Sequence, residues 1–264
     1  MAVQVDLPST LKTSVESSKA EYTQLGKSGL RASVPIFGTM SLARSKWSKW
    51  VKNEDQALPL LKMVYDRGIN SCDTAGLYSN GTAEEMVGKA IKKYDIPRHK
   101  VAIMTKCWAP VSEHDDVFVL TYWGELSKSK YQKLMGPKDL SRPAIFNSIE
   151  AYLKRMGTDY LDLLIMHRVD PSAPIKETME AFHHLIKSGK VSKLLLMERR
   201  GRQGYTMSQV ALVWLSKRIA CPVLGLSSSE RMDEALAIRG QNLSEAEEQY
   251  LEEAYKPRAL VGHG

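Results

Sequence analysis

The chain has 264 residues, of which 43% are hydrophobic and 25% charged, and this composition describes one globular domain with a sizeable core. No apolar run approaches the length of a membrane span, so we expect no membrane insertion. The N-terminal stretch has no hydrophobic signal core, so we expect no secretion. The net charge of +7 comes from dispersed Lys and Arg, so we expect a solvated surface and no nucleic-acid partner.

Strand-like and helix-like segments alternate along the chain, which predicts an α/β fold with a parallel sheet. Residues 1–20 are expected to be a flexible lead-in, and residues 21–264 a single domain. Six strands are predicted within residues 34–42, 69–73, 101–106, 161–167, 191–197 and 222–226. Helices are predicted at residues 55–67, 82–93, 143–156, 175–187 and 206–217, and from Ser229 onward.

Several residues mark where these helices begin and end. Ser141 is a predicted N-cap, Gly157 a predicted helix end and Gly189 a predicted C-cap. Ser244 and Glu247 form a capping-box pattern in the C-terminal tail. Residues 109–140 have no regular pattern, and because they follow a strand we expect them to lie over the mouth of the sheet.

The three cysteines, Cys72, Cys107 and Cys221, are scattered without the spacing of metal ligands. Two of them fall in strands that are predicted to be buried. We therefore interpret them as small apolar residues in a reducing cytoplasm, and we expect no metal site.

Four polar residues stand at the ends of strand-like segments: Asp73 and Tyr78 in INSCDTAGLY, Lys106 in VAIMTKCW and His167 in DLLIMHR. A parallel β/α barrel brings such strand ends to one mouth. Each residue alone has a structural interpretation: the Asp can be a helix cap, the Tyr a turn aromatic and the His a core residue. Their occurrence together, in β/α order, favours a catalytic site.

Carbonyl reduction requires a hydride from a cofactor and a proton for the carbonyl oxygen. Tyr78 is the predicted acid, and the ammonium of Lys106 is expected to lower the pKa of its phenol. Asp73 is expected to pair with Lys106, and His167 to orient and polarise the carbonyl.

Five stretches, YTQLGKSGLRASVPIFGTMSL, GINSCDTAGLYSNGTAEEMVGKAI, VAIMTKCW, YLKRMGTDYLDLLIMHR and TMSQVALVWL, resemble the aldo-keto reductases. The closest likeness is to the fungal norsolorinic-acid-reductase and aryl-alcohol-dehydrogenase-like group. The resemblance implies a TIM (β/α) barrel and an NADPH-dependent reductase of a small carbonyl substrate. It further implies that Gly38, Thr39, Met40 and Asp73 lie near the nicotinamide.

A second cofactor segment, PVLGLSSSERMDEAL, resembles the part of these enzymes that holds the adenosine 2′-phosphate. The resemblance implies phosphate contacts from Leu226, Ser227, Ser228 and Arg231, and an adenine contact from Glu234. Hydroxyls and an Arg at a helix N-terminus also form an anion site on electrostatic grounds alone.

The chain departs from the family after residue 196, where ERRGRQG stands in place of two further β/α units. Arg199, Arg200 and Arg202 are either substitute phosphate contacts or part of a solvated connector. We therefore predict a barrel derivative that lacks about two β/α units. Six strands cannot close with the geometry of eight, so the sheet is expected to form a smaller barrel or to stay open. An open edge would favour a homo-oligomer.

The predicted function is NADPH-dependent reduction of an aldehyde or ketone to the alcohol. Trp47, Trp50, Trp108 and Trp123 lie in loops expected at the mouth, where they either favour an aromatic or polyketide-like secondary metabolite as the substrate or only pack the lid. The alternative is a protein without redox activity that catalyses a dehydration, isomerisation or cyclisation, or that serves as a binding partner. Loss of the segments that hold the nicotinamide and pyrophosphate favours this alternative.

Overall fold

The computed structural model describes residues 8–26, 28–119, 121, 140–168, 170, 172–196, 217, 219, 221–238, 242, 245, 248 and 249. Its central feature is a six-stranded sheet with the order β10-β3-β6-β7-β8-β9, in which every neighbouring pair is parallel. The strands are β3 (Ile36–Gly38), β6 (Ser71–Asp73), β7 (Ala102–Cys107), β8 (Leu161–Met166), β9 (Val191–Leu196) and β10 (Val223–Leu224).

This sheet confirms the predicted α/β class and the six predicted parallel strands. The first and last strands in sequence lie next to each other, because β10 pairs with β3 as the last strand of a closed barrel pairs with the first. In the described part of the chain, β9 and β10 are the two ends of the sheet, so that part is open. The strand predicted at 191–197 is present as β9 over Val191–Leu196, and Met197 lies outside the described residues.

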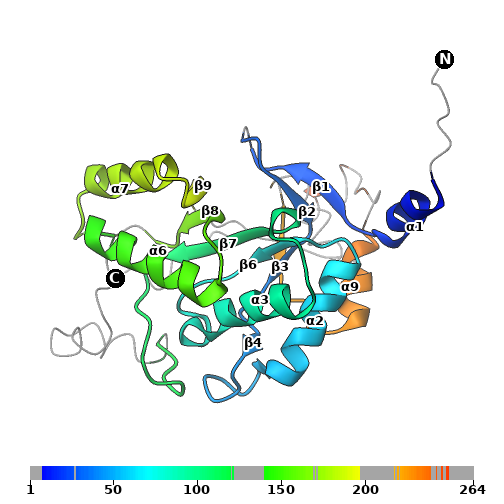
Figure 1. Ribbon diagram of the computed structural model, residues 1–264, viewed down its shortest axis with the longest axis horizontal. Coiled ribbons are helices and arrows are strands. Elements are labelled where there is room, and N and C mark those ends of the chain that lie inside the picture. The colour runs from blue at the N-terminus through cyan, green and yellow to red at the C-terminus, as the bar shows by residue number, and fades with distance from the viewer. Residues whose placement is uncertain are drawn as a thin grey trace.

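Helices follow the strands and cover one side of the sheet. Figure 1 shows α2, α3, α6 and α7 succeeding one another along this side, and α9 near α2. Among the described helices, none combines the length and apolar character needed to cross a bilayer. The bounds are α2 (Glu54–Asp66), α3 (Thr82–Lys93), α6 (Arg142–Met156), α7 (Ile175–Lys187) and α9 (Ser229–Leu236).

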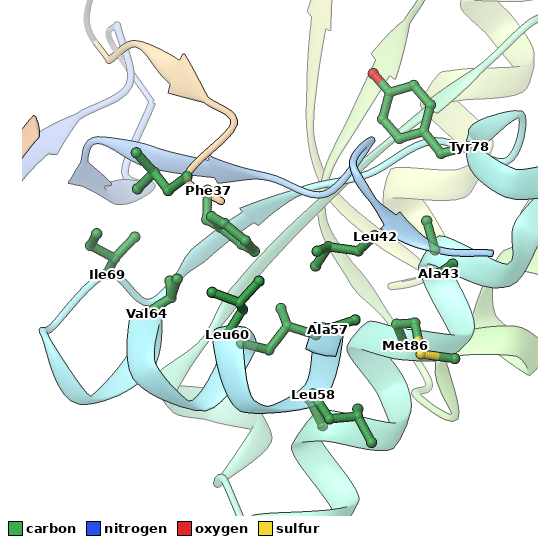
Figure 2. Packing of buried hydrophobic residues seen from close by; sticks show 14 of the residues in the cluster. Phe37, Leu42, Ala43, Ala57, Leu58, Leu60, Val64, Ile69, Tyr78 and Met86 are labelled. Carbon is green, nitrogen blue, oxygen red and sulfur yellow. The ribbon is translucent and has the colours of Figure 1, made fainter. Parts of the chain in front are cut away.

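The apolar spacing of α2 explains its place in the core. Leu58, Leu61 and Val64 recur at helical intervals and are all buried. Figure 2 shows Ala57 and Leu60 of α2 on the side that faces Phe37 of β3 and Leu42, whereas Leu58 points away from them. A second cluster lies between α3, α6, α7 and the strands β7 to β9.

The predicted helix signals are largely confirmed. Ser141 is the N-cap of α6 and accepts a hydrogen bond from the Ala144 amide, and Gly157 ends the helix with φ 62°. The C-cap of α7 is Ser188 rather than Gly189, which follows it with φ 76°. The predicted helix at 206–217 lies outside the described residues except for Lys217, as do Ser244 and Glu247 of the predicted capping box.

The N-terminal region contains elements that the sequence analysis did not predict. Helix α1 (Ser9–Ser17) falls within the predicted lead-in, and strands β1 (Glu21–Gln24) and β2 (Arg31–Val34) form an antiparallel hairpin. Ala32 of this hairpin is buried among Ala102, Leu163 and neighbouring apolar side chains on the inner side of the sheet. The hairpin therefore covers the end of the sheet opposite the predicted site. Two further short strands, β4 (Leu42–Ala43) and β5 (Lys52–Asn53), pair in the loop after β3.

Candidate active site

The four residues predicted to be catalytic gather at the carboxyl ends of three neighbouring strands. Asp73 is the last residue of β6, Lys106 lies next to the end of β7, and His167 directly follows β8. The amide of His167 donates to the Cys107 carbonyl at 3.1 Å, which ties this position to the end of β7. Tyr78 begins the turn η1 (Tyr78–Gly81) between β6 and α3.

Lys106 is the centre of the arrangement. Its ammonium forms an ion pair with Asp73 Oδ2 and donates to the Thr74 carbonyl at 2.9 Å and to the Tyr78 hydroxyl at 3.1 Å. The Lys106 and Asp73 side chains are only 4% and 5% exposed, so the charge pair is almost fully desolvated. Three polar partners match the three N–H donors of an ammonium. The predicted pairing of Asp73, Lys106 and Tyr78 is present in this geometry.

The electrostatics of Tyr78 differ in one respect from the expectation. Burial raises the pKa of the Tyr78 phenol, while the Lys106 ammonium opposes that shift. The net direction is upward, although the sequence analysis expected a pKa drawn toward neutrality. Burial likewise raises the pKa of the Asp73 carboxyl, and Lys106 again opposes the shift. The sequence could show the ammonium but could not show how far the site is removed from water.

His167 is held in its neutral form. Burial lowers its pKa to about 4, and the positive charges of Lys106 and Arg168 act in the same direction. At neutral pH the imidazole therefore carries one N–H donor and one acceptor nitrogen. Such a group can donate a hydrogen bond to a carbonyl oxygen without carrying a charge into the site.

Buried polar atoms without a hydrogen-bond partner concentrate around these residues. Within the described part of the chain they include Asp73 Oδ1, Thr74 Oγ1, Ser79 Oγ, Asn80 Oδ1 and His167 Nδ1. Buried polar groups are normally hydrogen-bonded in a folded protein. Their concentration next to Tyr78 and Lys106 fits a surface that receives a polar ligand.

The turn that carries Tyr78 has an unusual backbone. Ser79, Asn80 and Gly81 have φ values of 47°, 51° and 92°, which glycine adopts freely and other residues rarely adopt. Asn80 Nδ2 donates to the carbonyls of His114 and Val117 at 2.8 and 2.9 Å, and so holds the loop after β7 against the turn. Figure 2 shows the Tyr78 hydroxyl directed away from the apolar cluster on which its ring rests.

The residues predicted near the nicotinamide follow β3. Gly38 ends this strand, and a Cβ atom there would lie 3.2 Å from the Leu224 carbonyl oxygen, so glycine permits the close approach of β10. Thr39 is buried and donates its amide and its hydroxyl to the Asp73 carbonyl at 2.9 and 3.1 Å. The backbone at Asp73 is thereby fixed next to residues 38–40.

The residues predicted to bind the 2′-phosphate follow β10, so both cofactor segments lie at one edge of the sheet. Ser228 is the N-cap of α9 and accepts from the Arg231 amide at 3.4 Å. Arg231 Nη1 donates to Ser227 Oγ at 3.2 Å, and its side chain is exposed. Leu226 is buried, and Glu234 lies half-buried on α9. These groups fit an exposed anion site. The predicted substitutes Arg199, Arg200 and Arg202 lie outside the described residues.

No group of three metal-binding side chains occurs among the described residues. All three cysteines are free, and burial raises the pKa of the Cys72 and Cys107 thiols to about 12. These thiols are neutral at physiological pH, as expected of apolar filling residues.

The tryptophans expected at the mouth differ in how far they are exposed to solvent. Trp47 is buried, with its ring centroid 4.4 Å from that of Phe118 and 5.9 Å from that of Trp50. Trp50 is 50% exposed, and Trp123 lies outside the described residues. Arg168 lies over the ring of Trp108 at 5.3 Å. No pattern in the sequence marks Phe118 or the buried carboxylate of Glu84, because Glu84 resembles an ordinary first-turn acid of a surface helix.

Comparison with known proteins identifies the family of this chain. The sequence model of the Aldo/keto reductase family matches residues 36–196. An aldo-keto reductase of Fusarium vanettenii is 33% identical over 359 residues, which cover 97% of this chain and 97% of that protein. Versiconal hemiacetal acetate reductase of Aspergillus parasiticus is 29% identical over 341 residues, covering 91% of this chain and 98% of that protein.

Solved structures show the same fold. A holo-form aldo-keto reductase of Bacillus halodurans superposes with a TM-score of 0.70 at 20% identity, covering 92% of this chain and 99% of that one. The likeness therefore reaches the TIM-barrel architecture as well as the sequence. Together, the matched family region and the relatives show that this chain belongs to the aldo/keto reductase family, oxidoreductases that use nicotinamide cofactors.

Proposed function

We propose that this protein is an NADPH-dependent reductase that converts an aldehyde or ketone of an aromatic or polyketide-like secondary metabolite to the alcohol. The observation that carries the proposal is the buried cluster in which Lys106 Nζ contacts both Asp73 and the Tyr78 hydroxyl. When bound, NADPH supplies the hydride that no side chain can donate.

The side chains of this cluster have complementary tasks. Lys106 donates to the oxygen of Tyr78, which leaves the phenolic proton of Tyr78 free to be donated to a carbonyl oxygen. As that proton leaves, the ammonium stabilises the phenolate, and Asp73 holds the ammonium in place. The neutral imidazole of His167 can donate a second hydrogen bond to the same carbonyl oxygen and orient it.

The preference for NADPH over NADH rests on the start of α9. Ser227, Ser228 and Arg231 present two hydroxyls and an exposed guanidinium at a helix N-terminus. A phosphate group is favoured there by the helix dipole and by charge-assisted hydrogen bonds. NADH lacks the 2′-phosphate and would not gain these interactions.

The proposed substrate class rests on aromatic side chains near the site and on the named relatives. Trp50 offers an exposed ring beside the buried pair of Trp47 and Phe118. Flat rings stack well on such surfaces. A relative over most of the chain is named as a reductase of versiconal hemiacetal acetate, which supports a related substrate here.

The second candidate function is a non-redox acid/base step, or a binding role, in a protein that has lost two β/α units. The alignment with the Fusarium vanettenii relative runs over 359 residues whereas this chain has 264, so that relative contains segments without a counterpart here. The described sheet has six strands where the family barrel has eight. Tyr78 and Lys106 could still act as an acid/base pair without a cofactor.

A fluorescence or calorimetric titration with NADPH, NADP and NADH separates the two candidates. The proposed reductase binds NADPH more tightly than NADH, and Arg231→Ala weakens NADPH binding while leaving NADH binding almost unchanged. Arg31→Ala, at an exposed position in the hairpin, is the matched control and should bind both as the original chain does. A folded protein without measurable NADPH affinity would leave only the second candidate.

We propose a homo-oligomer and a cytoplasmic location on separate grounds. The described sheet ends in two edge strands, β9 and β10, and open edges favour pairing with another chain. Three free cysteines suit a reducing compartment. Light scattering that shows a strict monomer at high protein concentration would contradict the oligomer.

A further inference from the structure

Behind β7 lies a buried ion pair that the proposed chemistry does not use. Nε and Nη2 of Arg155, on α6, lie 2.7 and 2.6 Å from Oε2 of Glu84, on α3. The hydroxyl of Thr105 donates to the other carboxylate oxygen at 2.7 Å. The Glu84 side chain is 0% exposed. Both oxygens of a fully buried carboxylate are thus bound by fixed donors.

Glu84 connects the two parts of the chain that carry Tyr78 and Lys106. Thr105 and Lys106 are adjacent in β7, so their side chains point to opposite faces of the sheet. Glu84 therefore binds the side chain of Thr105, next to Lys106, on the face of the sheet opposite the Lys106 side chain. It lies in the first turn of α3, which begins directly after the Tyr78 turn.

Helix α6 supports the same turn from outside. A Cβ atom at Gly81 would lie 2.7 Å from Arg155 Nε, and one at Gly76 would lie 2.7 Å from Tyr152 Cε1. Two side chains of α6 thus press against the backbone on either side of Tyr78. The Arg155 side chain packs against the turn at Gly81 and also binds Glu84, so one side chain restrains the positions of both.

We propose that Glu84, held by Arg155 and Thr105, is a positioning residue that sets the distance between the Tyr78 hydroxyl and Lys106 Nζ. This inference deepens the proposed reductase function and rests on it. A buried ion pair seldom adds net stability over apolar side chains of the same shape. We assign it a geometric role, because each carboxylate oxygen has its own donor, Arg155 Nε at Oε2 and the Thr105 hydroxyl at Oε1.

The charges around Glu84 agree with this role. Burial raises the pKa of Glu84, and Arg155, the Thr105 hydroxyl and Lys106 all oppose the shift. Burial has the larger effect, so the net direction of the Glu84 pKa is upward, but each of these three neighbours favours the carboxylate form. That form accepts hydrogen bonds at both oxygens and cannot turn without losing one of them.

The decisive variants alter the hydrogen bond between Thr105 of β7 and Glu84 without changing the charge of either side chain. Thr105→Val removes the hydroxyl at nearly constant shape, and Thr105→Ser keeps it. Thr105→Val is expected to lower kcat by about 10-fold to 100-fold with little change in KM, because small misplacements of catalytic groups are costly. Thr105→Ser is expected to restore kcat. Equal kcat per folded molecule in Thr105→Val and the original chain would overturn the proposal.

Glu84→Gln has a matched control at the other end of β7. Asp162 accepts from Arg98 Nη2 at 2.7 Å and from the Ile103 amide at 2.9 Å, and is likewise a carboxylate that joins an Arg to this strand. Glu84→Gln is expected to lower kcat, whereas Asp162→Asn lowers only the thermal midpoint. The same kcat loss in both variants would assign the Glu84 effect to general stability and overturn the proposal.

A spectroscopic readout separates this inference from the proposed function. The charged groups that act on the Tyr78 hydroxyl are Lys106 from β7 and Asp73 from β6. Carbon-13 labelling of the tyrosine ζ-carbons, with Tyr78 assigned by its loss in Tyr78→Phe, follows the Tyr78 pKa without any substrate. Displacement of Lys106 in Thr105→Val raises this pKa, and Thr105→Ser leaves it unchanged. An unchanged Tyr78 pKa in Thr105→Val overturns the positioning role. A chain that reduces no carbonyl overturns the reductase alone.

Discussion

The ammonium of Lys106 lies 3.1 Å from the hydroxyl of Tyr78, yet the backbone that joins them runs through the turn η1, the helix α3 and most of the strand β7. Burial of the site raises the pKa of the phenol, and the ammonium is the group that opposes the rise. Proton donation from Tyr78 thus depends on one contact between two elements. The contact is set by the packing of β6, β7 and α3.

Tyr78→Phe removes the proton donor and leaves the ring, which packs on the apolar cluster, in place. Turnover of a carbonyl substrate is expected to fall on the order of 10²-fold to 10⁴-fold. The thermal midpoint should change little, because within the described part of the chain Lys106 is the one donor to this hydroxyl. Tyr94→Phe, at the end of α3, is the control for a lost tyrosine hydroxyl and should keep its turnover. Full activity in Tyr78→Phe would remove this residue from the mechanism.

Lys106→Met leaves the Asp73 carboxylate buried without its cation. Breaking a buried pair from one side costs about 3–5 kcal/mol of unfolding free energy. The exposed pair of Lys62 and Asp66 is the comparison, because an i,i+4 surface pair contributes about 0.3–0.5 kcal/mol. Urea denaturation should therefore show a large loss for Lys106→Met and almost none for Lys62→Met. Similar losses in both would mean that the Asp73 site is open to water.

The pKa of His167 lies at about 4, below its ordinary value of 6.5, chiefly because of burial. Between pH 6.5 and 4 the unfolded chain binds a proton at this position and the folded chain does not. The contribution of His167 to stability is therefore lost as the pH falls through this window, and is constant above pH 6.5. His167→Gln should flatten the fall of the thermal midpoint between pH 6.5 and 4. The same substitution at exposed His99 should keep the original slope.

The sequence predicted the strand ends well because their signals are local. Asp73, Lys106 and His167 each stand at the end of a strand-like segment, and parallel strands place such residues together by topology alone. The hairpin of β1 and β2 escaped prediction because its four-residue strands contain few apolar residues and show no clear period. The upward pKa shift of Tyr78 and the burial of Glu84 also escaped, because both depend on how closely α3 and α6 pack.

That packing predicts the effect of Gly88→Ala in α3. A Cβ atom at Gly88 would lie 2.4 Å from the Met156 carbonyl oxygen, a backbone atom that cannot turn aside. Alanine favours a helix by up to about 1 kcal/mol over glycine, but forced separation of two packed elements costs about 1–3 kcal/mol. Urea denaturation should therefore show a net loss of stability. Gly29→Ala is the control, because no heavy atom lies within 4 Å of the new Cβ and the change should stay within about 0.5 kcal/mol. A Gly88→Ala chain at least as stable as the original would mean that α3 and α6 are not in close backbone contact, and would weaken the case that α6 supports the Tyr78 turn.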